Sequence, residues 1–252
     1  MTDAPFPLAP AALPLFHTNI VAVSPRRHAN LRLNRDAGFG FTAGVASLPV
    51  GIAEFEAAAG CYPILFTTAT PAAPIVLLGF RSGWNLFVDG TGTWMPRAYV
   101  PAIARAFPFV MIDDTDGSFR RVGFEADAAC ISPTTGAPLF ENGQQTAVVR
   151  DAIAFCEAVE GDLAAAAAFG AALESAGLLQ PGEATIEPQG APSVRIGGYR
   201  IVDAARLAAI PDEVFLAWRR NGWLSPLYAH LFSAVNWVAF TELALAQLAA
   251  RQ

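Results

Sequence analysis

The stretch that decides the fold covers residues 62–80 and reads YPILFTTATPAAPIVLLGF. Two runs within it, residues 62–68 and 73–80, consist mainly of β-branched, aromatic and aliphatic residues, which is typical of buried strands. The pair Thr70-Pro71 lies between them and favours a turn, because proline fixes its own φ and has no N–H for a strand ladder. We therefore predict two neighbouring buried strands here.

The rest of the N-terminal half favours short strands and turns. Its apolar runs predict strands at residues 19–23, 39–45, 109–112 and 120–125. Short helices are predicted at residues 52–59 and 101–107. Asp89-Gly90 predicts a tight hairpin between residues 85–88 and 92–94, because these two residue types tolerate positive φ. A second hairpin turn is predicted at residues 113–117.

The pattern changes to helices in the C-terminal half. Residues 146–177 predict an alanine-rich helix, either single or broken near Gly161 or Gly170, that ends at Gly177. A hairpin is predicted around Gly197-Gly198, from strands at 193–196 and 199–202. Acids after Pro211 favour a helix start there. A closing helix is predicted over residues 226–250, with an apolar stripe of Leu227, Leu231, Val235 and Val238.

The fold class is therefore predicted to be α+β, with a mainly antiparallel β N-terminal half that has short helices and a helical C-terminal half. The composition shifts near residues 133–143. We place a β-rich half at residues 1–135 and a helix-rich half with a hairpin at residues 136–252, packed together as one unit.

Composition excludes two classes of protein. The 252 residues are 54% hydrophobic and 15% charged, so most of the chain is too apolar for intrinsic disorder. All 16 basic residues are arginine, and the net charge is −6. Nucleic acid is not an expected partner, because its recognition requires a basic face that neutralises phosphates.

Cysteine usage and the apolar segments bear on location. The chain has three cysteines, Cys61, Cys130 and Cys156. Their number is odd and their spacing does not suit a metal site, which favours reduced thiols in the cytosol. Residues 1–19 lack the positively charged start of a secretory signal. The most apolar stretches, 163–173 and 231–240, are shorter than the about 20 residues that span a bilayer. We expect a cytoplasmic protein without a transmembrane segment, with a signal-independent route to the cell surface as the alternative.

Segments along nearly the whole chain resemble the SapC family, bacterial proteins named after a surface-layer gene cluster. In chain order they are Arg27-His28-Ala29, Leu31-Arg32-Leu33, Glu54-Phe55, Tyr62-Pro63-Ile64, Asn85-Leu86-Phe87-Val88-Asp89, Tyr99-Val100-Pro101-Ala102, Phe107-Pro108-Phe109, Pro138-Leu139-Phe140, Leu207-Ala208-Ala209-Ile210-Pro211-Asp212-Glu213, Asn221-Gly222-Trp223-Leu224 and Tyr228-Ala229-His230-Leu231. The resemblance implies a link to surface-layer biogenesis and serum resistance. Similar proteins are often encoded beside outer-membrane receptors and flavin-dependent halogenase-like enzymes. The resemblance brings no catalytic residues.

Six residues are candidates for ligand binding: Arg27, His28, Tyr99, Trp223, His230 and Asn236. Arg27 and His28 lie in a basic turn that could hold a carboxylate or phosphate through the arginine fork, or could be a solvated turn with local ion pairs. Histidine ordinarily titrates near neutrality, so His230 could act as a base or a ligand, with Asn236 on the same predicted helix. The alternative is a core histidine bonded to a neighbouring loop.

The aromatic residues around Trp223 leave two interpretations open. Trp218, Trp237 and Tyr228 lie nearby in the sequence. Aromatic side chains with polar tips are enriched at protein interfaces, and they also fill contacts between helices. Tyr99 is a candidate because it lies in a segment that resembles the family and because it belongs to the site of the enzyme alternative given below.

Motifs for catalysis and cofactors are missing. Residues 113–117 lack the alternating acids of a calcium loop, and no histidine or cysteine spacing suits zinc. There is no G-x-S-x-G elbow and no glycine loop placed to cradle phosphate. We therefore predict no metal, no cofactor and no catalytic residue.

Three functions follow, in order of preference. The first is a non-enzymatic binding or assembly protein that uses a protein or peptide partner and is linked to surface-layer or outer-membrane processes. The second is a structural component of a surface layer. The third is an auxiliary enzyme with a site near Arg27, His28, Tyr99 and His230, which requires these side chains to converge in one cavity.

Overall fold

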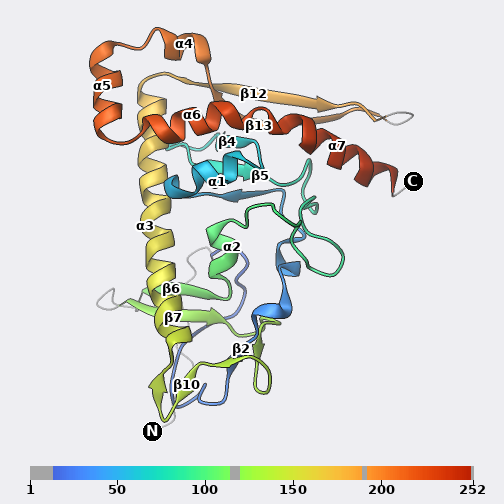
Figure 1. Ribbon diagram of the computed structural model, residues 1–252, viewed down its shortest axis with the longest axis vertical. Coiled ribbons are helices and arrows are strands. Elements are labelled where there is room, and N and C mark those ends of the chain that lie inside the picture. Colours follow the sequence, from blue (N-terminus) through green and yellow to red (C-terminus); the bar gives the residue numbers. More distant parts are fainter. Residues whose placement is uncertain (1–13, 114–119, 189–191, 251–252) are drawn as a thin grey trace. The chain divides into compact units, whose positions relative to one another are not determined.

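The computed structural model describes residues 14–113, 120–188 and 192–250 (Figure 1). The chain forms two compact units, and each unit combines two segments. Unit 1 is Met1–Gly38 with Ala106–Ala158, and unit 2 is Phe39–Arg105 with Val159–Gln252. The predicted division between residues 135 and 136 falls within unit 1, and it stays a prediction about composition.

Unit 1 contains small antiparallel sheets. The first has the order β1 (Ile20–Ala22), β7 (Arg120–Glu125) and β6 (Phe109–Asp113). The second places β2 (Arg32–Leu33) between β8 (Ile131–Ser132) and β9 (Ala137–Pro138). The remaining elements are the 3-10 helix η1 (Arg35–Ala37) and the paired strands β10 (Phe140–Glu141) and β11 (Gln144–Gln145). The strands predicted at 19–23, 109–112 and 120–125 are confirmed, while most of the predicted 113–117 turn lies outside the described residues.

The core of unit 1 lies between these strands and the start of helix α3 (Ala147–Ser175). From α3 it receives Val149, Ala152 and Cys156, which are spaced by three and four residues and so lie on one helix face. Phe109 and Phe124 pack against each other from paired strands, with ring centroids 6.5 Å apart. Burial of these apolar side chains is the main stabilising term for the unit.

Unit 2 is built on a five-stranded antiparallel sheet. Its order is β12 (Leu179–Ile186), β13 (Val194–Val202), β4 (Ile64–Thr67), β5 (Pro74–Leu77) and β3 (Ser47–Pro49). Strands β4 and β5 arise from residues 62–80, and Ile64 pairs with Val76. The predicted pair of buried neighbouring strands is confirmed.

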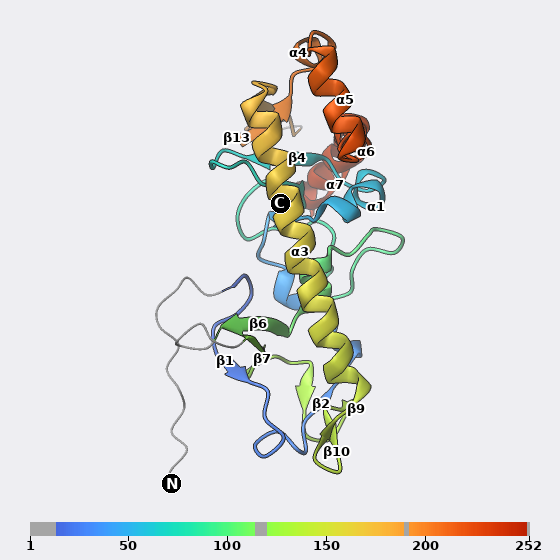
Figure 2. The same ribbon diagram turned by 90° about the vertical axis from the view of Figure 1, so that its left-hand side faces the viewer.

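Helices complete unit 2, and the last four follow one another at the end of the chain in orange and red in both views (Figures 1 and 2). They are η2 (Gly40–Thr42), η3 (Ile52–Glu54), α1 (Phe55–Ala59), α2 (Ala102–Ala106), residues 159–175 of α3, α4 (Ala204–Ala208), α5 (Asp212–Arg220), α6 (Leu224–Ser233) and α7 (Asn236–Ala249). The last residue of α2, Ala106, belongs to unit 1. Helix α6 contacts both α1 and β4, and α7 contacts β12. Helices form 38% and strands 24% of the structure, and every strand pair among the described residues is antiparallel, so the predicted α+β class is confirmed.

The strand predicted at residues 39–45 is wrong. The segment is a 3-10 helix with turns, in which the N–H of Thr42 donates to the carbonyl of Phe39 and that of Ala43 to Gly40. The Thr42 hydroxyl donates to the same Phe39 carbonyl, at 2.7 Å. Local bonds of this kind compete with a strand ladder and satisfy the backbone without one.

The hairpin predicted around Gly197-Gly198 is also wrong. Residues 194–202 are one strand, β13, and the glycine pair lies within it at a bulge opposite the register shift between Gly182 and Ala184. Its partner is β12, where a Cβ on Gly182 would lie 2.2 Å from the Tyr199 ring. Glycines in a strand often mark such bulges and close approaches, so the same residues suit either a turn or a strand.

Three other elements differ in extent from the prediction. The hairpin predicted at residues 85–94 is shorter than expected: Val88 and Trp94 form a single antiparallel bridge around the Asp89–Thr93 turn, where the N–H of Asp89 donates to the carbonyl of Thr93. Residues 147–175 form one unbroken helix, and Gly177 has the predicted positive φ of 65° just beyond its end. The closing helix is two helices, α6 and α7, bent by 43°. Only part of its predicted stripe is buried, because Val235 and Val238 are exposed.

Candidate functional site

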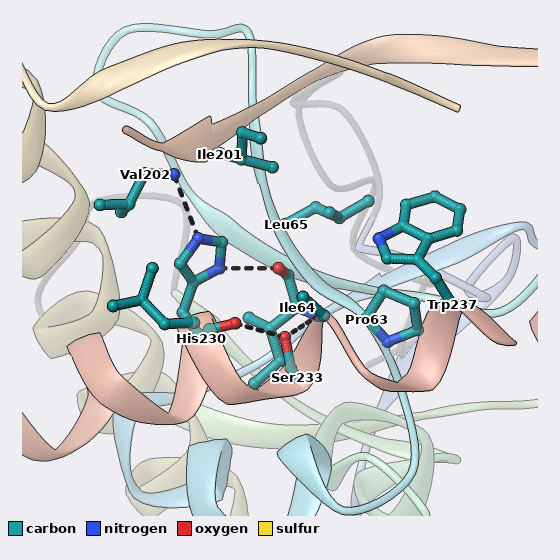
Figure 3. Close-up of a pocket in the computed structure, with 10 residues that line it drawn as sticks. Pro63, Ile64, Leu65, Ile201, Val202, His230, Ser233 and Trp237 are labelled. Carbon is teal, nitrogen blue, oxygen red and sulfur yellow. Dashed lines mark hydrogen bonds between the residues drawn. The ribbon is translucent and has the colours of Figure 1, made fainter. Parts of the chain in front are cut away.

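Three polar side chains at the junction of α6 and α7 point toward residues 59–64 and the start of β4 in unit 2. They are His230, Ser233 and Asn236, spaced by three residues, so they follow one side of the chain as it leaves α6. Figure 3 shows His230 and Ser233 beside Ile64 of β4. His230 and Ser233 are 5% and 1% exposed, respectively.

His230 bridges two strands of the sheet. Its Nδ1 donates to the carbonyl of Ile64, at 2.8 Å, and its Nε2 accepts from the N–H of Val202, at 3.1 Å (Figure 3). The register of β13 on β4 pairs Arg200 with Phe66. Two residues further along this register, Val202 would stand opposite Ile64. The imidazole therefore connects the two strands where their direct pairing stops.

The environment of His230 keeps the ring neutral. Burial lowers its pKa from the ordinary 6.5 to about 4, although the hydrogen bond to Ile64 acts in the opposite direction. A proton on Nε2 would also place two N–H donors, those of Nε2 and Val202, against each other, which disfavours the charged ring. Since both ring nitrogens are bonded to backbone, His230 acts as a structural link and has no free nitrogen for a substrate.

Ser233 and Asn236 fix the chain segment that precedes β4. The Ser233 hydroxyl donates to the carbonyl of His230, at 2.6 Å, and accepts from the N–H of Ile64, at 3.0 Å. The Asn236 amide donates to the carbonyls of Ala59, at 2.7 Å, and Tyr62, at 3.0 Å. Residues 59–64 are therefore held by polar side chains from the α6–α7 junction.

A small pocket lies beside His230 (Figure 3). Its volume is about 120 Å³, and its walls are Pro63, Ile64, Leu65, Ile201, Val202, His230, Leu231, Ser233, Ala234 and Trp237. Sites for small-molecule ligands usually measure about 300 Å³ or more. The lining is mostly apolar, and its two polar side chains are already bonded to backbone. The pocket suits a small apolar group.

Tyr99 belongs to a second polar network in unit 2, centred on the buried carboxylate of Glu54. Glu54 Oε1 accepts from the Tyr99 hydroxyl, at 2.9 Å, and from the N–H of Ala102, at 2.6 Å. Glu54 Oε2 accepts from the N–H of Gly51, at 2.7 Å. Arg105 donates to the Tyr99 oxygen, at 2.8 Å. Burial and the nearby Glu54 charge raise the pKa of Tyr99 to about 12.

The backbone of Tyr99 also connects to residues 59–64. Its N–H donates to the Cys61 sulfur, at 3.3 Å, and its carbonyl accepts from the Tyr62 hydroxyl. Burial raises the pKa of Tyr62, whose oxygen also accepts from the Trp94 indole at 3.1 Å. Tyr99, His230 and Asn236 thus all contact residues 59–64. His230 and Asn236 bond to the backbone of this segment, and Tyr99 bonds to its side chains.

Trp223 lies among aromatic side chains of unit 2. Its ring centroid is 6.1 Å from that of Phe169 and 6.3 Å from that of the buried Trp218. These contacts correspond to the packing interpretation of the aromatic group.

Arg27 and His28 lie in unit 1. The His28 Nδ1 accepts from the N–H of Ser24, at 3.1 Å, and closes the basic turn. The ring stands edge-on to Phe124, with centroids 4.9 Å apart, and burial and the Arg27 charge lower its pKa. The geometry describes an ordered turn, and ligand binding by these two residues stays a prediction.

Several residues of these networks were not predicted as site residues, and two of them, Glu54 and Ser233, have a signal in the sequence. Glu54 stands three residues after Gly51, at the spacing of a capping box, and this signal could have shown that its carboxylate binds backbone. Ser233 lies three residues from both His230 and Asn236, which places it on their side of the chain. Among residues 14–113, 120–188 and 192–250, no cluster of three or more His, Cys, Asp or Glu could hold a metal ion.

The outer side of α6 and α7 is apolar. We define the apolar face as Tyr228, Phe232, Val235 and Val238, which are 41%, 69%, 73% and 68% exposed, respectively. Tyr228 and Phe232 stack, with ring centroids 6.3 Å apart. Glu242 is the only Asp, Glu, Lys or Arg between positions 224 and 249. A long helical stretch therefore presents large apolar groups to solvent with almost no charge.

Within the described part of the chain, no single helix has the length and apolar composition needed to cross a membrane. Helices α6 and α7 reach that length and composition only as a pair, across their 43° bend.

Comparison with known proteins gives one match. The SapC family model matches residues 23–240, which is most of the chain. No curated protein and no solved structure matches it. The segments that resemble the family include those that hold Tyr62, Tyr99 and His230, so the match covers both polar networks. The chain belongs to the SapC family.

Proposed function

We propose that the chain is a non-enzymatic binding or assembly protein that engages a protein or peptide partner through the apolar face of α6 and α7. One observation carries this proposal: Tyr228, Phe232, Val235 and Val238 are large, exposed and almost free of neighbouring charge. Folded monomers rarely leave extended apolar patches in water, and such patches commonly mark interaction sites.

The polar network behind the apolar face supports binding over catalysis. His230, Ser233 and Asn236 use their polar atoms to fix residues 59–64 and the start of β4. A general base needs a free nitrogen within reach of a substrate proton, and both nitrogens of His230 have backbone partners. This arrangement provides a rigid mount for α6 and α7, which lowers the entropic cost of binding.

The cellular setting of the proposal comes from the family. The resemblance to SapC proteins carries an association with surface-layer and outer-membrane processes, and we place this chain in such a process as a cytoplasmic assembly protein. Cell fractionation tests the location. Recovery in the cytoplasmic fraction is expected, whereas recovery with the envelope would favour a structural surface-layer component.

Photo-crosslinking tests the binding surface. A photoreactive amino acid replaces Phe232 in one version of the full chain and Leu15 in another, because Leu15 is also an exposed apolar residue, at 39%, but belongs to unit 1. We expect a discrete adduct with one partner protein at position 232 and none at position 15. The purified partner should then bind the unmodified chain.

The opposite result is equally clear. Equal labelling at the two positions would show that position 232 has no specific partner. Turnover of a small molecule by the purified chain, without an adduct at position 232, would favour the enzyme alternative. In that case His230 and Tyr99 would be the first residues to substitute.

A further inference from the structure

Helix α5 has a charged, exposed face that is separate from the apolar face defined above. The face consists of five exposed residues, Asp212, Glu213, Leu216, Arg219 and Arg220. Leu216 is 40% exposed, whereas Trp218 of the same helix is 5% exposed. Within the described ranges, no ion pair involves any of the four charged side chains.

The order of charges on α5 is symmetric about Leu216. Asp212 and Arg220 each lie four residues from Leu216, and Glu213 and Arg219 each lie three residues from it. Residues three and four apart share a helix face, so the five side chains form one continuous strip. The strip has acids at one end, leucine at the centre and arginines at the other end.

Complementing the helix dipole explains only part of this pattern. Acids near the start and arginines near the end of a helix are favourable by themselves. The dipole sets their position along the axis, but it does not require all four on one exposed strip with an apolar residue at its centre. Two antiparallel helix faces can match each other only when their charged and apolar residues lie together on one exposed strip, as they do on α5.

We propose that α5 pairs antiparallel with α5 of a second copy of this chain, about a two-fold axis at Leu216. In this arrangement Asp212 faces Arg220 and Glu213 faces Arg219 across the interface, twice each by symmetry, and the two Leu216 side chains meet at the centre. A parallel arrangement would set acids against acids and arginines against arginines. Complementary charges therefore select both the partner and its orientation.

Charge also explains why this face suits a second copy. Each chain carries a net charge of −6, so two copies repel over most of their surfaces. The α5 strip has two acids and two arginines and is neutral overall. Its nine residues extend about 13 Å, which is short for a stable interface. The dimer is consequently weak, dependent on concentration and sensitive to salt.

Charge reversal tests the pairing. Sedimentation equilibrium on the full chain should show a mass that rises from monomer toward dimer with concentration and falls back when salt is added. One variant carries Asp212→Arg with Glu213→Arg, and a second carries Arg219→Glu with Arg220→Glu. In each variant like charges face each other, and we expect the dissociation constant to rise at least about tenfold.

The decisive experiment uses an equimolar mixture of the two variants. The α5 helices of the two variants are opposite in charge, so a heterodimer should form more readily than either variant associates with itself. Melting temperatures near that of the unchanged chain would show that both variants fold. A monomer at every concentration, or a dimer that both reversals leave intact, would overturn the proposal.

A matched variant separates this inference from the proposed function. Phe232→Ser with Val235→Ser alters the apolar face and leaves α5 unchanged. The α5 dimer should persist in this variant, and its loss would assign self-association to the apolar face instead. Conversely, the α5 reversals should leave the adduct at position 232 unchanged.

Discussion

At the scale of single residues, the side chains that looked most like a functional site mainly hold backbone in place. His230 links Ile64 to Val202, and Asn236 caps the end of α1 through Ala59. Their chemistry could be predicted from the sequence, but their partners could not. Those partners lie 28 to 177 residues away in the chain, and only the folded sheet brings them within hydrogen-bond distance.

Replacing His230 tests its role as a link. His230→Ala should lower the free energy of unfolding by about 2–4 kcal/mol, because it leaves the Val202 N–H and the Ile64 carbonyl buried without partners. His230→Gln is the matched control, since its amide can donate to one group and accept from the other, and it should cost clearly less. Urea unfolding measures both variants. Equal losses would contradict the linking role.

The pH dependence of stability isolates the same ring. Its pKa in the folded chain, about 4, lies below the ordinary 6.5, so a proton binds the unfolded chain more readily. The stability from neutral His230 is therefore complete above about pH 6.5 and is lost as the pH falls toward about 4, by roughly 3 kcal/mol in total. His28 has a pKa shift of the same sign, so the difference between the unchanged chain and His230→Gln gives the contribution of His230. A difference that stays constant across this range would contradict the assignment.

Glu54 is a second buried polar residue whose hydrogen bonds stabilise unit 2. Its carboxylate accepts from Gly51, Tyr99 and Ala102, all of which are donors. Glu54→Gln would turn an amide donor toward one of these donors, and we expect a loss of about 2–4 kcal/mol in stability. Glu56→Gln, on the exposed side of α1, should change stability by less than about 0.5 kcal/mol. Thermal unfolding of both variants checks the prediction, and similar effects would show that Glu54 is not a specific anchor.

At the scale of elements, local sequence patterns were sufficient to predict strands whose pairing partners are close in the chain. Residues 62–80 pair with each other as β4 and β5, and their composition identified both strands. Strand β12 was missed because Pro181 and Gly182 favour a loop, and its pairing with β13 depends on the fit of Tyr199 over Gly182. The break between α6 and α7 was missed because its apolar spacing continues across the bend.

The glycines of α3 provide a test at this scale. A Cβ on Gly161 would meet nothing within 4 Å, whereas one on Gly170 would lie 1.8 Å from the Ala72 carbonyl oxygen. Gly161→Ala should therefore stabilise the chain by about 0.5–1 kcal/mol, through higher helix propensity. Gly170→Ala should destabilise it by about 1–3 kcal/mol, because the helix must move away from Ala72. Denaturant midpoints distinguish the two, and effects of the same sign would contradict this packing.

At the scale of the whole molecule, the pattern of apolar segments along the sequence correctly indicated a mixed α+β chain. It contained no signal for two compact units that each combine distant segments, because that division depends on contacts between residues far apart in the sequence. Sequence alone also could not tell which side of the closing helices would be buried. The structure turns the polar residues inward and leaves four large apolar residues exposed, which reverses the usual expectation for a surface helix.

The claim that the apolar face binds a partner is tested most directly by one affinity measurement. Isothermal titration compares the crosslinked partner's binding to the unchanged chain, to Phe232→Ser with Val235→Ser, and to the control Leu15→Ser. We predict that the double variant weakens binding at least about tenfold, while the control leaves it unchanged. Equal affinity for all three chains would contradict the account.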